Sequence, residues 1–334
     1  MDRIWVLAEQ RDGVPAGVAL ELVTAACGFA PVVEAVTWGP RSWNAVEVLG
    51  GYGVTRVYDA GDIGDSLPGP RLAATMSTRI LGGDRPDAVL IGSSYDGRDI
   101  AARLSVRLDL PVLTNVVGLY VSEGGLVTEH AIFGGSTVVR ARFTDGVPGL
   151  FVVKPKSFVA EPVGESGPRH PEIVAMELPE LGATDLARIV ARHEDWRSGP
   201  RLDEAHVVVS GGRGLGSPDN YALVTELAQL LNGAPGASRA IVDAGWVPYA
   251  FQVGQTGKTV KPDVYIACGI SGATQHMVGM KGAKKIIAIN KDREAPIFAI
   301  ADLGIVGDVT QVMPKLIDEI RARRDSDLPP GSTA

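Results

Sequence analysis

The feature that most constrains the fold is an alternation of short apolar runs with amphipathic stretches over the first 108 residues. Short apolar runs predict buried strands, and hydrophobic residues at helical spacing between them predict crossover helices. Such alternation builds a parallel sheet covered by helices, so we expect a Rossmann-like or flavodoxin-like α/β fold. The predicted strands are Ile4–Glu9, Val32–Trp38, Val54–Tyr58 and Asp87–Gly92, and the predicted helices are Pro15–Ala26, Trp43–Leu49, Arg71–Leu81 and Arg98–Leu108.

After Pro111 the apolar residues recur with period two, which predicts added antiparallel strands. These segments are Val112–Val121, Leu126–Ile132, Thr137–Arg142 and Leu150–Lys154. Residues 161–205 are rich in Pro, Gly and charge, with weakly strand-like pieces at Glu172–Leu178 and Ala187–His193. Because 334 residues exceed what one hydrophobic core usually serves, this shift in composition predicts a domain boundary near residue 195.

A second α/β pattern follows the boundary. It starts with a buried strand, His206–Ser210, a glycine-rich turn and the amphipathic helix Pro218–Leu231. Further strands are predicted at Ser238–Val242, Val264–Gly269 and Lys285–Asn290, and a last helix at Asp308–Arg324. We therefore expect an N-terminal α/β domain at 1–195, a doubly wound domain at 196–324 and a flexible tail at 325–334.

Charge and composition exclude several classes of protein. With 32 basic and 39 acidic side chains the net charge is −7, which argues against a nucleic-acid platform. No apolar run approaches the roughly 18 residues that a membrane span needs, so neither membrane insertion nor secretion is indicated. The only cysteines, Cys27 and Cys268, are far apart, and we expect both to be reduced and buried in a cytoplasmic protein. No His or Cys spacing predicts a metal site.

Two glycine-containing turns invite comparison with phosphate-binding loops. The turn Ser210–Gly216 follows a strand, but its spacing does not match the dinucleotide fingerprint. It predicts either a phosphate contact or a tight turn with Arg213 in solvent. The stretch Gly254–Thr259 lacks the first glycine of a P-loop, since Gln252 occupies that position, and it leads through Pro262 into a strand. It predicts an anion-facing loop or a plain surface turn.

A third turn, Gly269–Ala273, resembles a nucleophile elbow, in which a strand delivers Ser271 to the start of a helix. Ala273 stands where that motif requires glycine, and His276 lies too far round a helix from Ser271 to pair with it. Capping or phosphate binding therefore suits Ser271 better than acyl transfer. His276 by itself indicates a structural histidine. The polar residues Ser238, Arg239, Asn290 and Asp308 also fall near predicted strand ends, where ligands bind in open α/β sheets.

In this setting residues 207–314 resemble the alpha subunit of electron transfer flavoproteins, the FixB family, which carries FAD. The N-terminal 195 residues are similar to the family only in pattern, with local matches at Asp96–Leu104 and Phe133–Gly135. The long matching stretches, in order, are Val209–Gly216, Gly236–Ala240, Val242–Tyr249, Gln252–Thr259, Gly269–His276, Ile289–Asp292, Ala295–Phe298 and Val306–Asp308.

The resemblance implies a set of FAD-binding residues and no catalytic or metal-binding residue. Arg213, Ser238 and Arg239 would approach the flavin, and Asn290 and Asp308 would serve the ADP half, with Val309 beside Asp308 offering its backbone. The resemblance also implies that Thr256 contacts the flavin N5 and His276 its pyrimidine edge. The remaining implied residues line the ring and the phosphates: Gln252, Val253, Gly254, Gln255, Ser271, Gly272, Ala273, Thr274 and Gln275.

The resemblance further implies an electron carrier rather than an enzyme. It would accept electrons one at a time, through an anionic semiquinone, from flavin dehydrogenases such as the acyl-CoA dehydrogenases of fatty acid β-oxidation, and pass them to a membrane quinone oxidoreductase. Its partner would be a beta subunit holding AMP or a second FAD. Two alternatives are an NAD(P)-dependent oxidoreductase using the C-terminal domain and a non-redox adenine-nucleotide sensor. One chain identifies neither the donor nor whether electrons are bifurcated.

Overall fold

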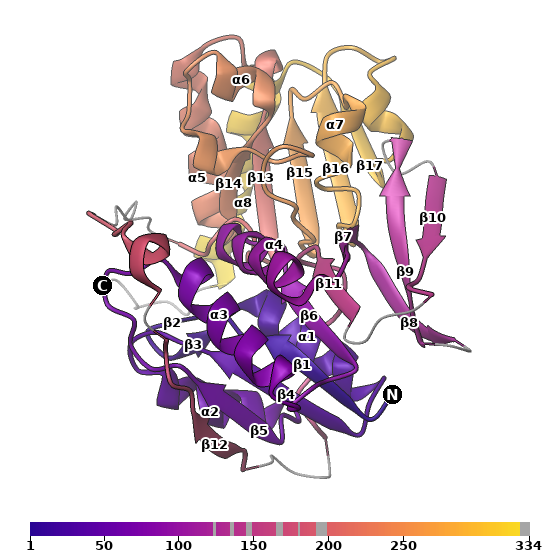
Figure 1. Cartoon of the computed structure of the whole chain (residues 1–334). Coiled ribbons are helices and arrows are strands. Elements are labelled where there is room, and N and C mark those ends of the chain that lie inside the picture. Colours follow the sequence, from indigo (N-terminus) through magenta and orange to yellow (C-terminus); the bar gives the residue numbers. More distant parts are fainter. Residues whose placement is uncertain are drawn as a thin grey trace. The chain divides into compact units, whose positions relative to one another are not determined.

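A computed structural model describes residues 1–122, 125–133, 137–144, 149–164, 170–179, 181–191 and 199–327. The chain divides into two compact units, Met1–Glu194 and Asp195–Ala334 (Figure 1). Each unit is built on its own parallel sheet with its own buried clusters, which confirms the predicted α/β fold class. None of the helices in the described ranges combines the length and apolarity of a membrane span.

The first unit contains a seven-stranded parallel sheet in the order β12-β5-β4-β1-β6-β11-β7. The order β5-β4-β1-β6 is the Rossmann arrangement, in which the chain winds outward from β1 in both directions. The central strands are buried because helices cover both faces of the sheet. The strands are β1 (Arg3–Leu7), β4 (Val32–Thr37), β5 (Arg56–Asp59), β6 (Ala88–Gly92), β7 (Val112–Val116), β11 (Gly149–Val153) and β12 (Glu172–Ala175).

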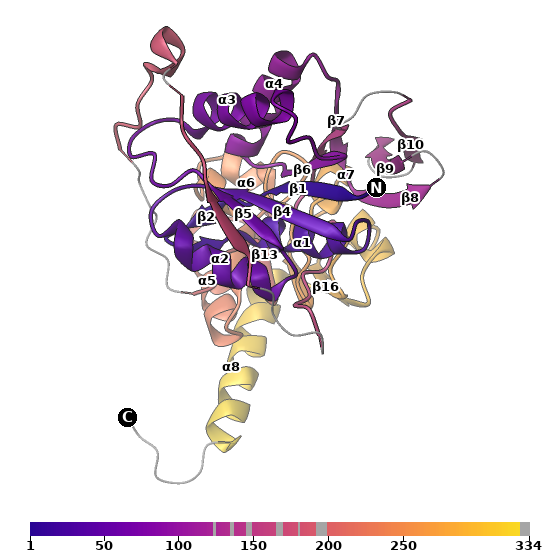
Figure 2. The same cartoon turned by 60° about the horizontal axis from the view of Figure 1, so that its bottom comes forward.

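Four helices cover this sheet, two on each face. Figure 2 shows α3 (Pro68–Leu81) and α4 (Tyr95–Leu108) on one side, and α1 (Gly17–Cys27) and α2 (Ser42–Gly51) on the other. Each pair buries a cluster of aliphatic side chains against the sheet, and the two clusters share no residue. The amphipathic stretches of the sequence therefore become crossover helices, as predicted. A short hairpin, β2 (Gln10–Arg11) and β3 (Val14–Pro15), precedes α1.

The prediction of added antiparallel strands is right for only part of the period-two region. The antiparallel sheet consists of β8 (Gly118–Ser122), β9 (Gly125–Ile132) and β10 (Thr137–Ala141). By contrast, β7 and β11 join the main sheet as parallel strands, which corrects the assignment of residues 112–116, the first half of Val112–Val121, and of Leu150–Lys154. The residues of β11 are uninterrupted apolar and fully buried, which is the signature of a strand covered on both faces.

The structure corrects two smaller predictions, on the cysteines and on the segment Ala187–His193. Cys27 is exposed rather than buried because it ends α1 at the surface, whereas Cys268 is buried. The weakly strand-like piece Ala187–His193 forms only an isolated bridge between Ser66 and Arg188, next to the 3₁₀ helix η2 (Gly182–Asp185). Residues 192 and 193 lie outside the described residues.

The second unit contains a five-stranded parallel sheet in the order β14-β13-β15-β16-β17. Numbered along the chain this is 2-1-3-4-5, so the winding direction reverses between β13 and β15. The helices α5 (Tyr221–Leu230) and α8 (Val309–Asp327) pack together on one face of the sheet. The strands are β13 (Val207–Gly211), β14 (Ala234–Ala237), β15 (Val264–Cys268), β16 (Lys285–Asn290) and β17 (Leu303–Val306).

Loops and short helices cover the other face of this sheet. Their apolar side chains, including Val260, Met280 and Ile297, pack against Tyr265 and Ala267 of β15. Because several of these segments are only one turn long, backbone groups at the carboxyl ends of the strands are accessible to a ligand. Among the short helices, α7 (Thr274–Met277) and η6 (Pro296–Ala299) lie on this side of the sheet. The others lie beside α5 and α8: η3 (Arg213–Leu215), η4 (Pro218–Asn220), α6 (Arg239–Asp243) and η5 (Tyr249–Phe251).

The predicted strand Ser238–Val242 is wrong. The strand in this region is β14, Ala234–Ala237, and Arg239–Asp243 forms α6. The sequence of β14, Ala-Pro-Gly-Ala, contains no β-branched residue. Its proline is tolerated because β14 lies at the edge of the sheet. The predicted tail also begins too early, since α8 extends to Asp327, and residues 328–334 lie outside the described residues.

Candidate functional site

A cavity of about 690 Å³ lies at the carboxyl ends of β13 and β15. This is the switch point of the sheet, where ligands of open α/β proteins bind. The volume is within the range of roughly 300–1,000 Å³ typical of small-molecule sites. Most residues that the sequence singled out line it: Arg213, Ser238, Arg239, Gln252, Val253, Gly254, Gln255, Thr256, Ser271, Ala273, Gln275, His276 and Asn290.

The floor of the cavity is built by glycines of two loops that touch each other. Gly214 N donates to Gly269 O at 2.9 Å, and Gly212 N donates to Cys268 O at 2.9 Å. A Cβ on Gly214 would lie 2.6 Å from Gly269 Cα, so no larger residue fits without a shift of the backbone. The glycine-rich turn after β13 therefore serves close packing of the two loops. Arg213, between these glycines, is exposed and lines the cavity wall.

The loop that resembled a P-loop forms another wall. Val253 N donates to Ala237 O at 2.9 Å, and Gln255 N donates to Gln275 O at 2.7 Å, so the loop is bonded to β14 and to the residue before His276. Gly254 has φ +143°, and an added Cβ would lie 2.8 Å from Gln275 O. Lys258 Nζ lies 2.9 Å from Asp203 Oδ1. The lysine is thus used in an ion pair that anchors the loop.

Thr256 presents a hydroxyl at this wall with its direction set by Gln252. The Gln252 side chain is buried, and its Nε2 donates to Thr256 Oγ1 at 2.9 Å. Because the hydroxyl oxygen already accepts this bond, its own hydrogen is free to be donated elsewhere. Thr256 is exposed and lines the cavity, so the pair forms a donor aimed by a buried amide.

The turn after β15 offers backbone donors. Within the described residues, the amides of Ser271, Gly272, Ala273 and Thr274 donate to no protein acceptor, and α7 begins at Thr274. Successive free amides at the start of a helical turn attract anions such as phosphate. In the part of the chain that the structure describes, Ser271 makes no hydrogen bond to His276, whose ring is held by Tyr265. The geometry suits anion binding rather than a nucleophilic serine.

His276 is a second buried polar side chain at the cavity, with 6% of its surface exposed. Tyr265 Oη lies 2.9 Å from its Nε2. Burial lowers the pKa of His276 to about 4, and the nearby Val253 backbone opposes this only in part. Nδ1 has no partner of normal hydrogen-bond geometry in the described structure. The imidazole is therefore neutral at pH 7, with one nitrogen held and the other unsatisfied.

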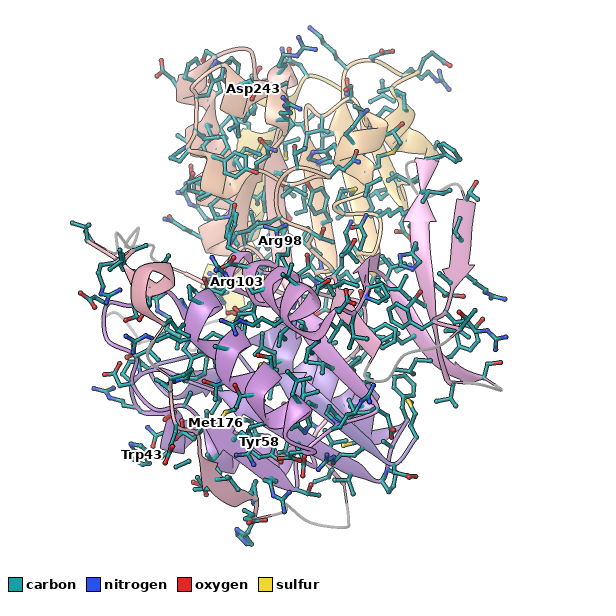
Figure 3. All side chains as sticks on the ribbon, in the orientation of Figure 1. Trp43, Tyr58, Arg98, Arg103, Met176 and Asp243 are labelled. Carbon is teal, nitrogen blue, oxygen red and sulfur yellow. The ribbon has the colours of Figure 1, made fainter. Side chains whose placement is uncertain are left out.

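Charged and amide groups complete the rim. Arg239 Nε lies 3.0 Å from Asp243 Oδ2, and both side chains are mostly exposed, with Asp243 at the outer end of α6 (Figure 3). Asn290 donates to Ile270 O at 3.0 Å and accepts from Asp292 N at 3.0 Å, which fixes the turn after β16. Asp243, Asp292, Ala295 and Pro296 also line the cavity; they fall within the stretches that match the family, but the sequence analysis did not assign them to FAD. Their position after strands or short helices was the available signal.

Four predicted residues do not line this cavity. Gly272 and Thr274 belong to the turn whose neighbours do, and they contribute backbone there. Asp308 precedes α8, and its Oδ1 accepts from Thr310 N at 2.9 Å and from Thr310 Oγ1 at 2.7 Å. Val309 is 2% exposed and packs in the core. Asp308 is thus a helix cap in the structure, and its contact with a cofactor stays a prediction.

The first unit has one perturbed carboxylate at the corresponding edge of its sheet. Glu9 follows β1, and Ser94 Oγ donates to its Oε1 at 2.5 Å. Burial raises the pKa of Glu9 from 4.5 to about 7, Ser94 opposes this, and the charge of Asp96 adds to it. Glu9 lines neither of the cavities found among the described residues. We treat it as a source of pH-dependent stability.

Glu9→Gln is expected to flatten the pH dependence of stability of the first unit. The pKa of Glu9 is higher in the folded state than in the unfolded state, so the folded state keeps the proton up to a higher pH. The contribution of Glu9 to wild-type stability is therefore greatest below pH 4.5 and is lost as the pH rises to about 7. The total loss is up to about 3 kcal/mol. Urea unfolding from pH 4.5 to 8 measures it, and Glu47→Gln on the exposed face of α2 should leave the wild-type slope. An equal slope in Glu9→Gln would contradict the assignment.

Comparison with known proteins adds independent evidence to this geometry. The model of the electron transfer flavoprotein domain matches residues 4–181, and that of the electron transfer flavoprotein FAD-binding domain matches residues 201–281. Electron transfer flavoprotein subunit alpha of Mycobacterium leprae is 41% identical over 332 residues, covering 97% of this chain and 100% of the relative. The subunit of Mycobacterium tuberculosis is 42% identical over 330 residues, with 97% and 100% covered. That of Thermoanaerobacterium thermosaccharolyticum is 37% identical over 324 residues, with 95% and 97% covered.

Proposed function

Because the chain belongs to the electron transfer flavoprotein alpha-subunit family, we propose that it is the FAD-carrying half of a heterodimer that moves electrons between proteins. FAD is the cofactor of the matched C-terminal domain. We propose further that its partner is the beta subunit, holding AMP or a second FAD. The donors would be flavin dehydrogenases such as acyl-CoA dehydrogenases, and the acceptor a membrane quinone oxidoreductase reached from the cytoplasm.

The observation that carries the proposal is the composition of the switch-point cavity. It combines free amides at Ser271–Thr274 for a pyrophosphate, a hydroxyl donor at Thr256 and two exposed arginines, Arg213 and Arg239. The unsatisfied Nδ1 of His276 and the cradle at Gly254 are what a bound group of this kind would complete. No paired acid and base or activated nucleophile converges on the cavity within the described residues. The site fits a carrier whose cofactor does the chemistry.

Bound FAD supplies the capacity to take up and release electrons. The chain's own residues would bind and tune it. The amides of Ser271–Thr274 hold phosphate charge, and Thr256 donates a hydrogen bond that Gln252 orients. Arg213 and Arg239 place positive charge where the flavin gains negative charge. Asn290 and, at the start of α8, Asp308 are proposed to serve the ADP half. Because His276 is neutral, it acts as a hydrogen-bond donor and adds no charge.

The proposal is tested by preparing the chain together with its beta subunit. We expect a yellow heterodimer with FAD bound to this chain, which a reduced acyl-CoA dehydrogenase reduces and a quinone reductase reoxidises. Absorbance near the flavin bands gives the stoichiometry, and stopped-flow spectroscopy gives the transfer rate. A heterodimer that stays colourless with excess FAD contradicts the proposal. If it instead binds NADH and oxidises it without a partner protein, the dehydrogenase alternative would be correct.

Arg239→Ala is expected to lower the midpoint potential of the bound FAD. The loss of a positive charge at the cavity makes reduction less favourable, but the side chain is 67% exposed, so solvent screens its effect. At the roughly 0.2–1 kcal/mol typical of exposed charges the shift is about 10–40 mV for a one-electron couple. Asp243→Asn removes the acid paired with Arg239 and should shift the potential in the opposite direction. Spectroelectrochemical titration measures the midpoint potential of both variants. Equal shifts in the same direction would show that Arg239 does not act on the flavin.

A further inference from the structure

Behind the cavity wall, a buried hydrogen bond connects the sheet to the site. Tyr265 is fully buried in β15, and its hydroxyl lies 2.9 Å from His276 Nε2. The two rings are 6.1 Å apart with an interplanar angle of 60°, so the contact is made through the hydroxyl and not by stacking. Tyr265 does not line the cavity, whereas His276 does. The tyrosine therefore touches the site only through the histidine.

The direction of this hydrogen bond follows from the surroundings. Burial raises the pKa of Tyr265 well above its usual range, and the neighbouring Ser210 hydroxyl opposes this only in part, so the phenol keeps its proton. The Val253 backbone also acts on His276, raising the pKa of the imidazole against the larger effect of burial. The Val253 N–H is already donated to Ala237 O. The protonated phenol lies within hydrogen-bond distance of Nε2 and donates to it, and a neutral imidazole that accepts at Nε2 carries its proton on Nδ1.

Resting on the proposed FAD-binding function, we propose that Tyr265 is a positioning residue of the cofactor site: by donating to Nε2, it fixes His276 as the Nδ1–H tautomer and holds the ring against the Val253 loop. That N–H has no full partner in the described structure, and an acceptor on FAD would complete it. The network runs from the sheet core at Tyr265 through His276 to the loop that also carries Thr256. A rigid layer of this kind keeps the groups that touch a ligand in place.

The test compares Tyr265→Phe with a matched control in the FAD-loaded heterodimer. Tyr221→Phe removes another buried tyrosine hydroxyl of the same unit, one that donates to Gly236 O at 3.0 Å and does not line the cavity. The first readout is the tautomer of His276, from long-range ¹⁵N–¹H spectra of ¹⁵N-histidine-labelled protein, with His276→Gln identifying the signal. The second is the FAD dissociation constant, measured by flavin fluorescence on dilution.

We expect the Nδ1–H tautomer in the wild type and in Tyr221→Phe, and loss of that tautomer in Tyr265→Phe. The FAD dissociation constant should rise about 3- to 10-fold in Tyr265→Phe alone, the range for one lost hydrogen bond. The proposal is overturned if wild-type His276 carries its proton on Nε2, if Tyr265→Phe changes neither readout, or if Tyr221→Phe weakens FAD equally. The wild-type spectrum tests the proposed tautomer of His276 even if Tyr265→Phe does not fold. If the wild-type heterodimer contains no FAD, the proposed function is wrong, but the tautomer of its His276 still tests the role of Tyr265.

Discussion

Gly269→Ala is expected to remove FAD from the heterodimer and to lower the free energy of unfolding of the second unit by about 2–5 kcal/mol. Gly269 has φ +66°, and an added Cβ would lie 2.7 Å from Gly214 Cα and 2.8 Å from Gly214 C. The left-handed backbone costs a residue with a side chain roughly 1–2 kcal/mol, and forced overlap adds roughly 1–3 kcal/mol. Both contacts are with backbone, which cannot rotate away, so the two loops that form the cavity floor must separate.

A second glycine separates these two contributions. Gly245 has φ +73°, nearly the same as Gly269, but a Cβ built on it meets nothing within 4 Å. Gly245→Ala should therefore show the conformational cost alone, about 1–2 kcal/mol, and retain FAD. Hydrogen exchange of the β15 amides measures the stability of this unit, and flavin absorbance after gel filtration measures retention. Equal losses in the two variants would show that close packing of Gly269 on Gly214 is unimportant.

The alternation of apolar runs and amphipathic helices was sufficient to predict both parallel sheets. It failed where a strand carries no strand-like residues. β14 reads Ala-Pro-Gly-Ala and is a strand only because it pairs with β13, a long-range contact that local periodicity does not report. The helix α6 that follows contains Ile241 and Val242, whose β propensity favoured the wrong assignment. The error in β11 was of another kind. Its residues were assigned to an antiparallel strand of period two, although their continuous apolar run is typical of a parallel strand covered on both faces.

The residues that line the site were easier to predict than those that hold them in place. Arg213, Ser271 and Asn290 end or follow strands, and parallel strands bring such ends to one edge, so the sequence grouped them correctly around one cavity. Thr256 lies in a loop between η5 and β15, and only the resemblance indicated its place at the site. Tyr265 could not be found this way, because a tyrosine within an apolar strand looks like any core residue. Its role depends on the distance to His276, which only the folded loop between them sets.

Glu34→Ala is expected to lower the free energy of unfolding of the first unit by about 3–5 kcal/mol, the range for breaking a buried charged network. Glu34, in β4, is 2% exposed. Its carboxylate accepts from Trp5 Nε1 at 2.8 Å, Arg56 Nη1 at 2.9 Å and Tyr58 Oη at 3.2 Å. Removing it leaves the fully buried Trp5 indole without its acceptor, whereas the hydroxyl of Tyr58, a residue labelled in Figure 3, keeps Asp84 Oδ2 at 2.9 Å. A buried donor without a partner costs roughly 1–3 kcal/mol by itself.

The same arginine supplies the control. Arg56 Nε also donates to Glu172 Oε2 at 2.9 Å, but the Glu172 side chain is 61% exposed. Glu172→Ala should therefore cost less than about 1 kcal/mol, since water replaces the lost partner. Hydrogen exchange of the β4 amides at pH 7 reports this unit separately from the other. If the two variants differ by less than 1 kcal/mol, Glu34 is solvated in the native ensemble and burial of its carboxylate does not determine the stability of this sheet.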